Sequence, residues 1–220
     1  LILCGLALAN RVMGRRQPSP DIAHSGDTVS VLIPAYNEEK VIALTVDRIL
    51  HSDYRNLEVL VIDDGSADRT AEVVRERFAG DPRVTLISIP NGGKANALNL
   101  AIRQATGTVV VALDADTQFN TDTISRLVRW FADPEIGAVA GNAKVGNRIN
   151  MVTRWQALEY IVAQNLERRA LAALDTITVV PGAVGAWRRA ALLEMGGFPS
   201  DTLAEDQDLT IAIQAKGYRA

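Results

Sequence analysis

The sequence has few of the side chains that build disulfide-bonded folds or zinc sites. Its single cysteine, Cys4, cannot form an internal disulfide, and its two histidines, His24 and His51, have no partner at zinc-ligand spacing. Any metal bound to this chain should therefore be held by oxygen atoms. A basic excess is also absent, since 23 Lys and Arg stand against 26 Asp and Glu and give a net charge of -3. This balance disfavours a nucleic-acid partner.

A long apolar run is missing as well. Segment 1–13 (LILCGLALANRVM) is mostly apolar, but a membrane-spanning helix needs roughly 20 such residues. We interpret it as the end of a longer transmembrane helix, with Arg15 and Arg16 on the cytoplasmic side by the positive-inside rule. A soluble apolar helix or strand is the alternative.

The length of 220 residues suits one well-buried domain, because two full domains would be a tight fit. We expect the end of a membrane helix at 1–16, a linker rich in Pro, Ser, Gly and Asp at 17–28, and one folded domain at 29–220. The sequence thus predicts a protein of the cell (inner) membrane whose folded domain faces the cytoplasm.

Short β-branched runs alternate with helical patterns, and the predicted strands are 29–34, 57–62, 84–89, 108–113 and 137–141. Nearly continuous apolar strands separated by helices predict an α/β domain with a mainly parallel central sheet flanked by helices. The residues expected to begin the intervening helices are Asn37, then Ser66 or Asp68, then Thr121. A longer helix is predicted from about 151 to 174.

Acidic side chains follow the predicted strands where each strand ends. In an open parallel sheet this edge binds ligands, because loops and helix N-termini converge there. Asp114 and Asp116 project to the same side of the chain. Two carboxylates form half of a site for Mg²⁺ or Mn²⁺, which substrate phosphates can complete. The alternative is that these aspartates cap the next helix.

Three further segments carry charged residues, and the first two of them suit a nucleotide. Asp63 and Asp64 follow the second strand, where a carboxylate can accept the N3–H of uracil; the alternative is a turn that caps a helix. Lys94 begins a helix after the third strand, and a cation beside free backbone N–H groups suits a diphosphate. Glu205, Asp206 and Asp208 lie far along the chain, and taken alone they are favourable charges in a helix's first turn.

Taken in order, five motifs resemble the family 2 glycosyltransferases: PAYNEE at 34–39, DDGSADRT at 63–70, NGGKANALN at 91–99, DAD at 114–116 and AED at 204–206. The resemblance covers about 29–220 and implies a GT-A fold with a Rossmann-like nucleotide-binding half. The segment VVPGAVGAWRRAAL at 179–192 and the apolar N-terminal tail resemble the membrane-bound processive branch, most of all the poly-β-1,6-N-acetylglucosamine synthases.

The resemblance implies a role for each matching residue. The residues that would bind the nucleotide-sugar are Ala35, Tyr36, Glu38, Asp63, Asp64, Lys94 and Asp114. The metal ligands would be Asp116 and Asp114, and the catalytic pair would be Asp206, as the base, and Glu205. Gly182 would lie in a loop near the acceptor sugar, and Trp187 would stack on a pyranose ring, with a place in the core as the alternative for Trp187.

The implied activity is an inverting, metal-dependent transfer of a sugar, N-acetylglucosamine by this resemblance, from a UDP-sugar to a growing β-linked polysaccharide. Asp206 would take the proton of the acceptor hydroxyl, while Mg²⁺ or Mn²⁺ would neutralise charge on the departing UDP. The sequence departs from the family pattern at two places, and we expect the two departures to differ in their effect on activity. Ala204 replaces a commoner threonine but leaves the carboxylates in place, whereas the Q-x-x-R-W motif of processive members lies beyond the point where this chain ends. The alternative function is a non-catalytic nucleotide-sugar-binding module.

Overall fold

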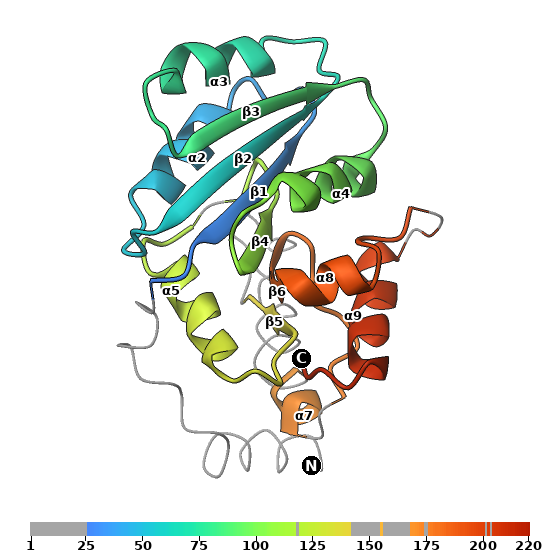
Figure 1. Cartoon of the computed structure of the whole chain (residues 1–220). Coiled ribbons are helices and arrows are strands. Elements are labelled where there is room, and N and C mark those ends of the chain that lie inside the picture. Colours follow the sequence, from blue (N-terminus) through green and yellow to red (C-terminus); the bar gives the residue numbers. More distant parts are fainter. Residues whose placement is uncertain are drawn as a thin grey trace.

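The structure is a computed structural model and describes residues 26–117, 119–141, 155, 168–173, 176–200, 202 and 204–220. Strands and helices alternate along most of this part of the chain (Figure 1). The strands are β1 (Val29–Ala35), β2 (Leu57–Asp64), β3 (Val84–Ile89), β4 (Val109–Leu113), β5 (Ala138–Ala140) and β6 (Val184–Arg188). The helices are α2 (Ile42–Leu50), α3 (Thr70–Phe78), α4 (Lys94–Gln104), α5 (Thr123–Val128), the 3-10 helix η2 (Arg129–Ala132), α7 (Arg168–Ala173), α8 (Arg189–Glu194) and α9 (Glu205–Ala215).

The strands form one sheet in the order β3-β2-β1-β4-β6-β5. The four strands from β1 to β4 run parallel to one another, whereas β6 is antiparallel to β4 and β5 is antiparallel to β6. The mainly parallel sheet predicted from the sequence is therefore confirmed. Because β2 and β4 both pair with β1, the strand order changes direction beside β1, and such a switch point opens a crevice at the carboxyl ends of the strands.

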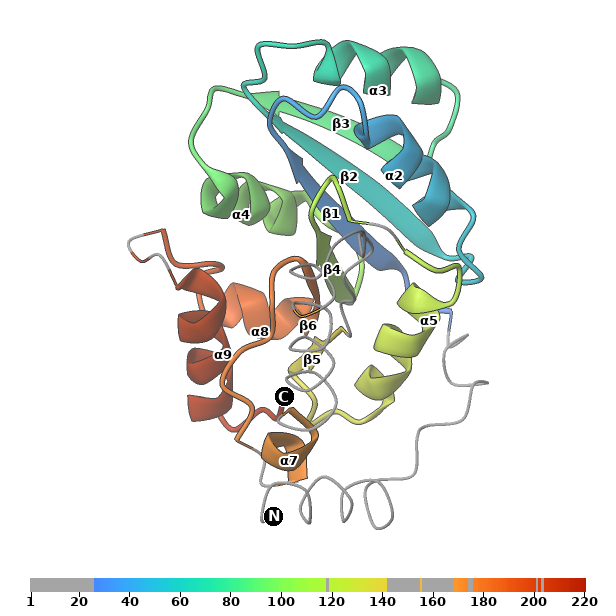
Figure 2. The ribbon, with the colours of Figure 1, turned by 180° about the vertical axis from the view of Figure 1, so that it is seen from behind.

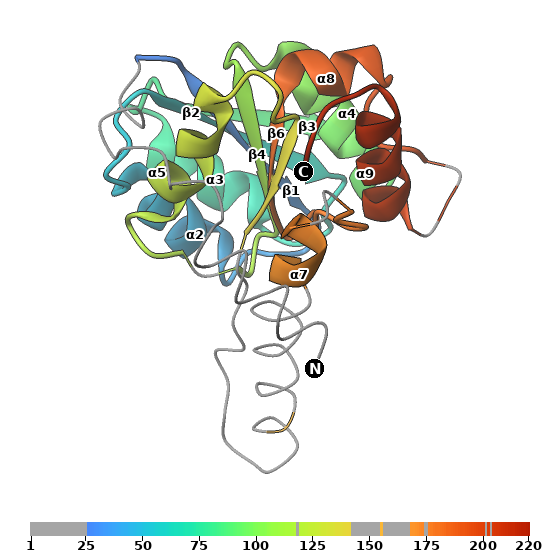
Figure 3. The ribbon, with the colours of Figure 1, turned by 90° about the horizontal axis from the view of Figure 1, so that it is seen from below.

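Alternate residues of the central strands face two different helical layers. Val31 and Val59 pack with α2, α3 and α5 on one face, whereas Leu32 and Leu60 pack with α4, α8 and α9 on the other. Figure 3 shows these two groups of helices on opposite sides of the strands. Burial on both faces explains why the central strands are almost continuously apolar in sequence.

Helices α8 and α9 lie side by side in both Figure 1 and Figure 2. Lys216 and Glu194 form an ion pair between their C-terminal ends at 3.2 Å. Leu192 of α8 and Leu209 of α9 join the same buried cluster as α4. This layer carries the start of α9, where the last acidic group of the sequence lies.

One central strand, β6, was not predicted from the sequence. Its residues include Gly185 and Ala186, which have little strand propensity. A Cβ at Gly185 would overlap the ring of Trp187, so the glycine makes room for the indole. Close packing, rather than a β-branched pattern, places this strand in the sheet.

The predicted helix start at Asn37 is wrong, because α2 begins only at Ile42. Asn37 takes a left-handed backbone conformation with φ of 58°, and its side-chain Oδ1 accepts the N–H of Ala67 at 2.8 Å. The Asn37 side chain therefore binds the loop after β2 instead of capping a helix. Residues between Asn37 and Ile42 form a turn in which the carbonyl of Glu38 accepts the N–H groups of Val41 and Ile42.

The other helices begin near the residues predicted from the sequence. Neither Ser66 nor Asp68 occupies the cap position of α3, although the Asp68 carboxylate accepts the N–H of Thr70 at 3.0 Å. Thr121 precedes α5 by two residues, with Asp122 at its cap position. Lys94 is the first residue of α4, as predicted.

Several sequence predictions fall largely outside the described residues. The membrane-helix end at 1–16 lies entirely outside them, and so does all of the linker at 17–28 except its last three residues. Of the helix predicted from 151 to 174, Trp155 and α7 are described. Among the described ranges, no helix is both long enough and apolar enough to cross a bilayer.

Glu58, on β2, provides a test of the fold. Its Oε1 accepts the hydroxyls of Ser30 (2.6 Å) and Thr106 (3.0 Å) and the N–H groups of Thr106 (2.7 Å) and Gly107 (3.3 Å). Burial alone would raise the pKa of Glu58, but these hydrogen bonds outweigh it and lower the pKa. The stabilisation is thus present above the ordinary glutamate pKa and is lost as the pH falls through the lowered value.

We expect Glu58→Gln to lower the free energy of unfolding at pH 7 by about 1 kcal/mol, because hydrogen bonds to a charged, partly exposed acceptor are weakened. Urea unfolding of both proteins measures the difference. The difference in unfolding free energy should shrink when the urea titration is repeated at a pH below the lowered pKa of Glu58, where the native carboxylate is protonated. An equal difference at both pH values would contradict this account.

Candidate functional site

A pocket of about 360 Å³ opens beyond the carboxyl ends of β1, β2 and β4. Its lining residues are Pro34, Ala35, Tyr36, Glu38, Asp64, Lys94, Asp114, Ala115 and Asp116. Every residue predicted to bind the nucleotide or the metal lines this pocket except Asp63. The pocket lies at the switch point beside β1, where the sheet topology places ligand sites in open parallel sheets.

The positive charge of the pocket comes from Lys94, the first residue of α4. Its Nζ lies 2.5 Å from Oδ1 of Asp114, which directly follows β4. Both side chains keep more than a third of their surface exposed, at 37% and 36%. Lys94 can therefore contact a ligand while it offsets the charge of Asp114, and the N-terminus of α4 adds a favourable dipole for a phosphate.

The carboxylates of the pocket lie close enough to repel one another. The pKa of Glu38 is raised by burial and then by the negative charges of Asp116, Asp68 and Asp114. Such a surplus of negative charge suits a bound divalent cation. Among the described residues no group of three or more acidic, His or Cys side chains could hold a metal by itself. Asp114 and Asp116 nevertheless fit Mg²⁺ or Mn²⁺, which one or two carboxylates commonly bind together with substrate phosphates.

Asp64 is 5% exposed and has a structural task as well as a place in the pocket. Its Oδ1 accepts the N–H of Gly92 at 2.8 Å, and its Oδ2 accepts the N–H of Gly93 at 2.9 Å. These bonds fix the loop that leads into Lys94. Each oxygen keeps a second lone pair, so contact with a ligand stays feasible.

Asp63 lies beside the pocket rather than in it. Its side chain is 6% exposed, and its Oδ1 accepts the N–H of Ser66 at 3.1 Å. The residue pairs in register with Ala35 of β1. The structure thus places Asp63 in the turn after β2, although Ser66 of this turn does not cap α3.

The loops after β1 and β2 are bound to each other by side chains whose sequence pattern is typical of helix caps. The bonds are Asn37 N to Ser66 Oγ (2.9 Å), Ala67 N to Asn37 Oδ1 (2.8 Å), Glu38 N to Thr70 Oγ1 (2.8 Å), Glu39 N to Asp68 Oδ2 (3.1 Å) and Arg69 N to Glu39 Oε2 (3.1 Å). They hold the backbone on both sides of Glu38. In the sequence, the sign of this contact was that the first two predicted strands each run into a polar loop.

Asp206 lies in the first turn of α9 and faces Gly182, whose N–H donates to its Oδ2 at 2.7 Å. The pKa of Asp206 is raised, chiefly by burial and then by the negative charges of Glu205 and Asp114. The hydrogen bond from Gly182 and the charge of Lys94 lower the pKa but do not outweigh these effects. Asp206 does not line the pocket. It is nevertheless close enough to Lys94 and Asp114 for their charges to affect it, and its environment favours proton uptake.

The profile of the Glycosyl transferase family 2 matches residues 30–196. The chain belongs to this family. It is 37% identical over 206 residues to an N-acetylglucosaminyltransferase of Rhizobium sp. (strain N33), covering 87% of this chain and 46% of the relative. It is 30% identical over 192 residues to a poly-beta-1,6-N-acetyl-D-glucosamine synthase of Staphylococcus aureus (strain COL), covering 87% and 47%. The chain thus spans about half the length of these curated relatives.

Solved glycosyltransferases share the fold. A mannosyltransferase, PcManGT from Pyrobaculum calidifontis, in complex with GDP-Man and Mn²⁺, superposes with a TM-score of 0.78 at 33% identity, covering 99% of this chain and 62% of its own. TarS 1–349 of S. aureus in complex with UDP-GlcNAc superposes with a TM-score of 0.65 at 22% identity, covering 87% of this chain and 54% of its own. At this identity the likeness supports the fold alone. The family 2 domain described here therefore has the GT-A fold predicted from its sequence.

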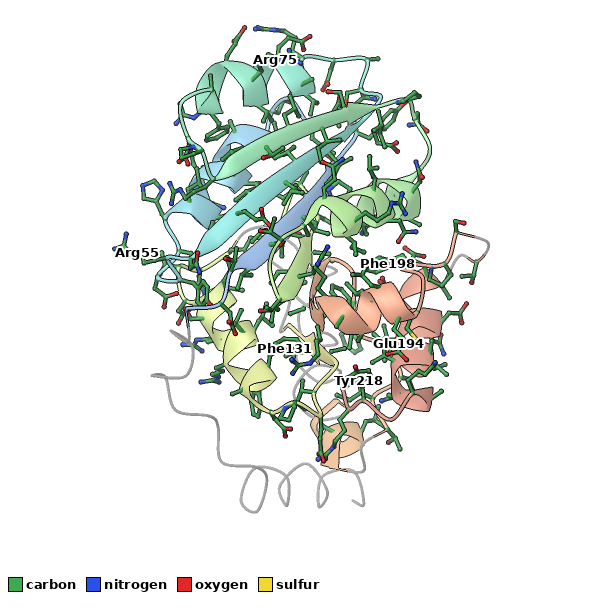
Figure 4. The ribbon with its side chains drawn as sticks, viewed as in Figure 1. Arg55, Arg75, Phe131, Glu194, Phe198 and Tyr218 are labelled. Atoms are coloured by element: carbon green, nitrogen blue, oxygen red, sulfur yellow. The ribbon has the colours of Figure 1, made fainter. Side chains whose placement is uncertain are left out.

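In this family 2 domain, the acceptor role predicted for Trp187 is wrong. Its side chain is fully buried and packs edge to face on Phe198, with ring centroids 5.3 Å apart. Figure 4 shows Phe198 where α4 approaches α8, and neither Phe198 nor Trp187 lines the pocket. An indole enclosed in this way has no free face for a sugar, so its place in the core, the alternative considered from the sequence, is the correct one.

Gly182 has no side chain, and this absence brings its backbone close to Asp206. A Cβ at this position would lie 2.7 Å from Oδ1 of Asp206, so Gly182→Ala should push the carboxylate aside. We expect sugar transfer to slow about 100-fold, because small displacements of a reacting group are costly. Nucleotide affinity should stay near the wild-type value.

Turnover assays and calorimetric titration with the nucleotide separate these two effects. Gly80→Ala is the matched control, since nothing lies within 4 Å of a Cβ there. A Gly182→Ala protein with normal turnover would show that the contact between Gly182 and Asp206 has no role in transfer.

Proposed function

We propose that this chain is the catalytic part of an inverting, metal-dependent enzyme that transfers N-acetylglucosamine from UDP-N-acetylglucosamine to a growing β-linked polysaccharide. The observation that carries the proposal is the gathering of Asp64, Lys94, Asp114 and Asp116 in one pocket, with Asp206 within reach of the charges of Lys94 and Asp114. The names of the relatives that are 37% and 30% identical support N-acetylglucosamine as the sugar.

The donor would bind across the switch point. Ala35, Tyr36 and Asp64, which line the pocket, would contact the uridine, and Lys94 suits the diphosphate. Asp114 and Asp116 would hold Mg²⁺ or Mn²⁺, which when bound stabilises negative charge on the leaving diphosphate. In this division Asp64 and Lys94 would contact the UDP-sugar itself, and Asp114 and Asp116 would contact its metal.

The acceptor hydroxyl would attack the anomeric carbon from the side opposite the diphosphate. Asp206 would accept the hydroxyl proton as the new carbon–oxygen bond forms and the bond to the UDP oxygen breaks, which inverts the anomeric centre. The N–H of Gly182 holds one carboxylate oxygen and leaves the other for the acceptor. A raised pKa brings the base closer to the working pH, which favours proton transfer.

A second donor, GDP-mannose, is supported by a specific observation. The mannosyltransferase at 33% identity was solved with GDP-Man and Mn²⁺. The two donors share a diphosphate and differ in the base and the sugar, so the groups that would contact the diphosphate suit both. A non-catalytic nucleotide-sugar-binding module stays the alternative from a different class, and it would bind a donor without releasing a nucleoside diphosphate.

For the site of action we propose the cytoplasmic side of the cell (inner) membrane. The support is the apolar segment 1–13 followed by Arg15 and Arg16 in the sequence. A polysaccharide acceptor that grows at a membrane surface accords with such an anchor. Fractionation of cells, followed by protease treatment of inside-out vesicles, tests both the membrane association and the orientation.

The donor and the base can be tested together with labelled UDP-N-acetylglucosamine, UDP-glucose and GDP-mannose. We expect transfer from UDP-N-acetylglucosamine. Asp206→Asn should reduce it by about 10²–10⁴-fold, the usual contribution of a general base, while UDP binding persists. Asp116→Ala should instead weaken Mn²⁺-dependent UDP binding in calorimetric titrations. Full turnover by the Asp206→Asn protein would remove the assigned base, and preference for GDP-mannose would replace the donor.

The pH dependence of turnover gives a further check on Asp206. A general base works deprotonated, so turnover is lost as the pH falls through its raised pKa, above the ordinary aspartate value. Glu205 contributes negative charge to this shift. Glu205→Gln should therefore move the acidic limb of the kcat profile to lower pH. A limb that moves to higher pH, or does not move, would contradict the assignment.

A further inference from the structure

The acidic turn after β4 is held by a residue outside the five motifs. We propose that Thr45, buried on α2, is a positioning residue of the donor site, whose hydroxyl fixes the backbone between Asp114 and Asp116 so that both carboxylates face one ligand. The inference rests on the proposed function, since it concerns how that site binds its metal and diphosphate.

The contact is short and buried. Oγ1 of Thr45 donates to the carbonyl oxygen of Ala115 at 2.5 Å, across 70 positions of the chain. Thr45 is 4% exposed and Ala115 is 4% exposed. The bond therefore joins α2 to the middle residue of the acidic turn in surroundings from which water is largely excluded, where such a bond is strongest.

The hydroxyl of Thr45 is directed away from its own helix. A threonine inside a helix commonly returns its hydroxyl to the carbonyl four residues earlier. In α2 the carbonyl of Val41 accepts the backbone N–H of Thr45 at 3.1 Å, while the hydroxyl reaches Ala115. Valine has nearly the same shape and lacks the hydroxyl, so Thr45→Val removes this bond and keeps most of the packing. The hydroxyl is thus needed for the bond rather than for packing.

An anchored Ala115 carbonyl also restrains the start of Asp116. The peptide unit is planar, so the oxygen of Ala115 and the nitrogen of Asp116 move together. The turn is closed locally by the N–H of Thr117, which donates to the Asp114 carbonyl at 3.0 Å. Thr45 adds the connection from this turn to another element. Together the two bonds define where the side chains of Asp114 and Asp116 leave the backbone.

This constraint matters because the side chains it positions carry like charges. Asp114 and Asp116 both raise the pKa of Glu38, and Lys94 pairs with Asp114. Carboxylates that repel one another separate when their backbone is free to move. A backbone anchored from α2 keeps them together before the ligand arrives, and groups behind the metal ligands typically affect metal affinity in this way.

The test compares Thr45→Val with Thr45→Ser in the purified protein. Calorimetric titration with Mn²⁺ at saturating UDP measures the affinity, and thermal unfolding measures stability. We expect Thr45→Val to weaken Mn²⁺ binding about 10-fold, the size of effect seen when groups behind metal ligands are changed. Thr45→Ser keeps the donor and should bind Mn²⁺ nearly as well as wild type. If the valine protein does not fold, Thr45→Ala takes its place.

Ser125→Ala is the matched control. Ser125 is 8% exposed on α5, and its hydroxyl donates to Asp53 at 2.5 Å, away from the pocket. Loss of the hydrogen bond between Ser125 and Asp53 should lower the unfolding temperature while Mn²⁺ binding stays unchanged. If Thr45→Val binds Mn²⁺ as well as wild type, or if Ser125→Ala loses as much affinity, the positioning role is overturned. If the wild-type protein binds neither Mn²⁺ nor UDP, the proposed function fails instead.

Discussion

The site depends on keeping several carboxylates close together at the carboxyl ends of three neighbouring strands. Like charges at short range destabilise the folded chain unless cations, hydrogen-bond donors or a ligand offset them. Here Lys94 pairs with Asp114, and the N–H groups of Gly92 and Gly93 bind Asp64. The compensation is partial, because the pKa of Glu38 is raised by burial and then also by the negative charges of Asp116, Asp68 and Asp114. A pocket left in this state favours a ligand that brings positive charge with it, such as a metal-bound diphosphate.

Much of the polarity around the pocket serves to hold its walls. Asn37, Glu39, Ser66 and Asp68 bind the neighbouring loop rather than a ligand. Their hydrogen bonds leave Glu38, which lies between Asn37 and Glu39 along the chain, in a fixed position on the pocket wall. The polar residues that join these two loops therefore act mainly through the backbone that they position.

The antiparallel half of the sheet contributes the other side of the site. Strand β6 follows the loop that contains Gly182, and α9 begins with the acidic turn that contains Asp206. Thr210, fully buried on α9, joins these two segments: its hydroxyl donates to the Asp206 carbonyl (2.6 Å) and accepts the N–H of Val180 (2.9 Å). The proposed base, Asp206, is thus held by α9 and the segment before β6, while the pocket is built at the parallel strands.

The sequence by itself determined the parallel strands and the order of the acidic groups, because burial on both faces and strand ends leave local patterns. It did not determine β6, because Gly185 of this strand is explained only by the ring of Trp187, which occupies the space where a Cβ would lie. It also could not show that Asn37 binds the loop after β2 or that Thr45 reaches the turn after β4. Those contacts join residues 30 and 70 positions apart, and only the folded chain brings them within hydrogen-bonding distance.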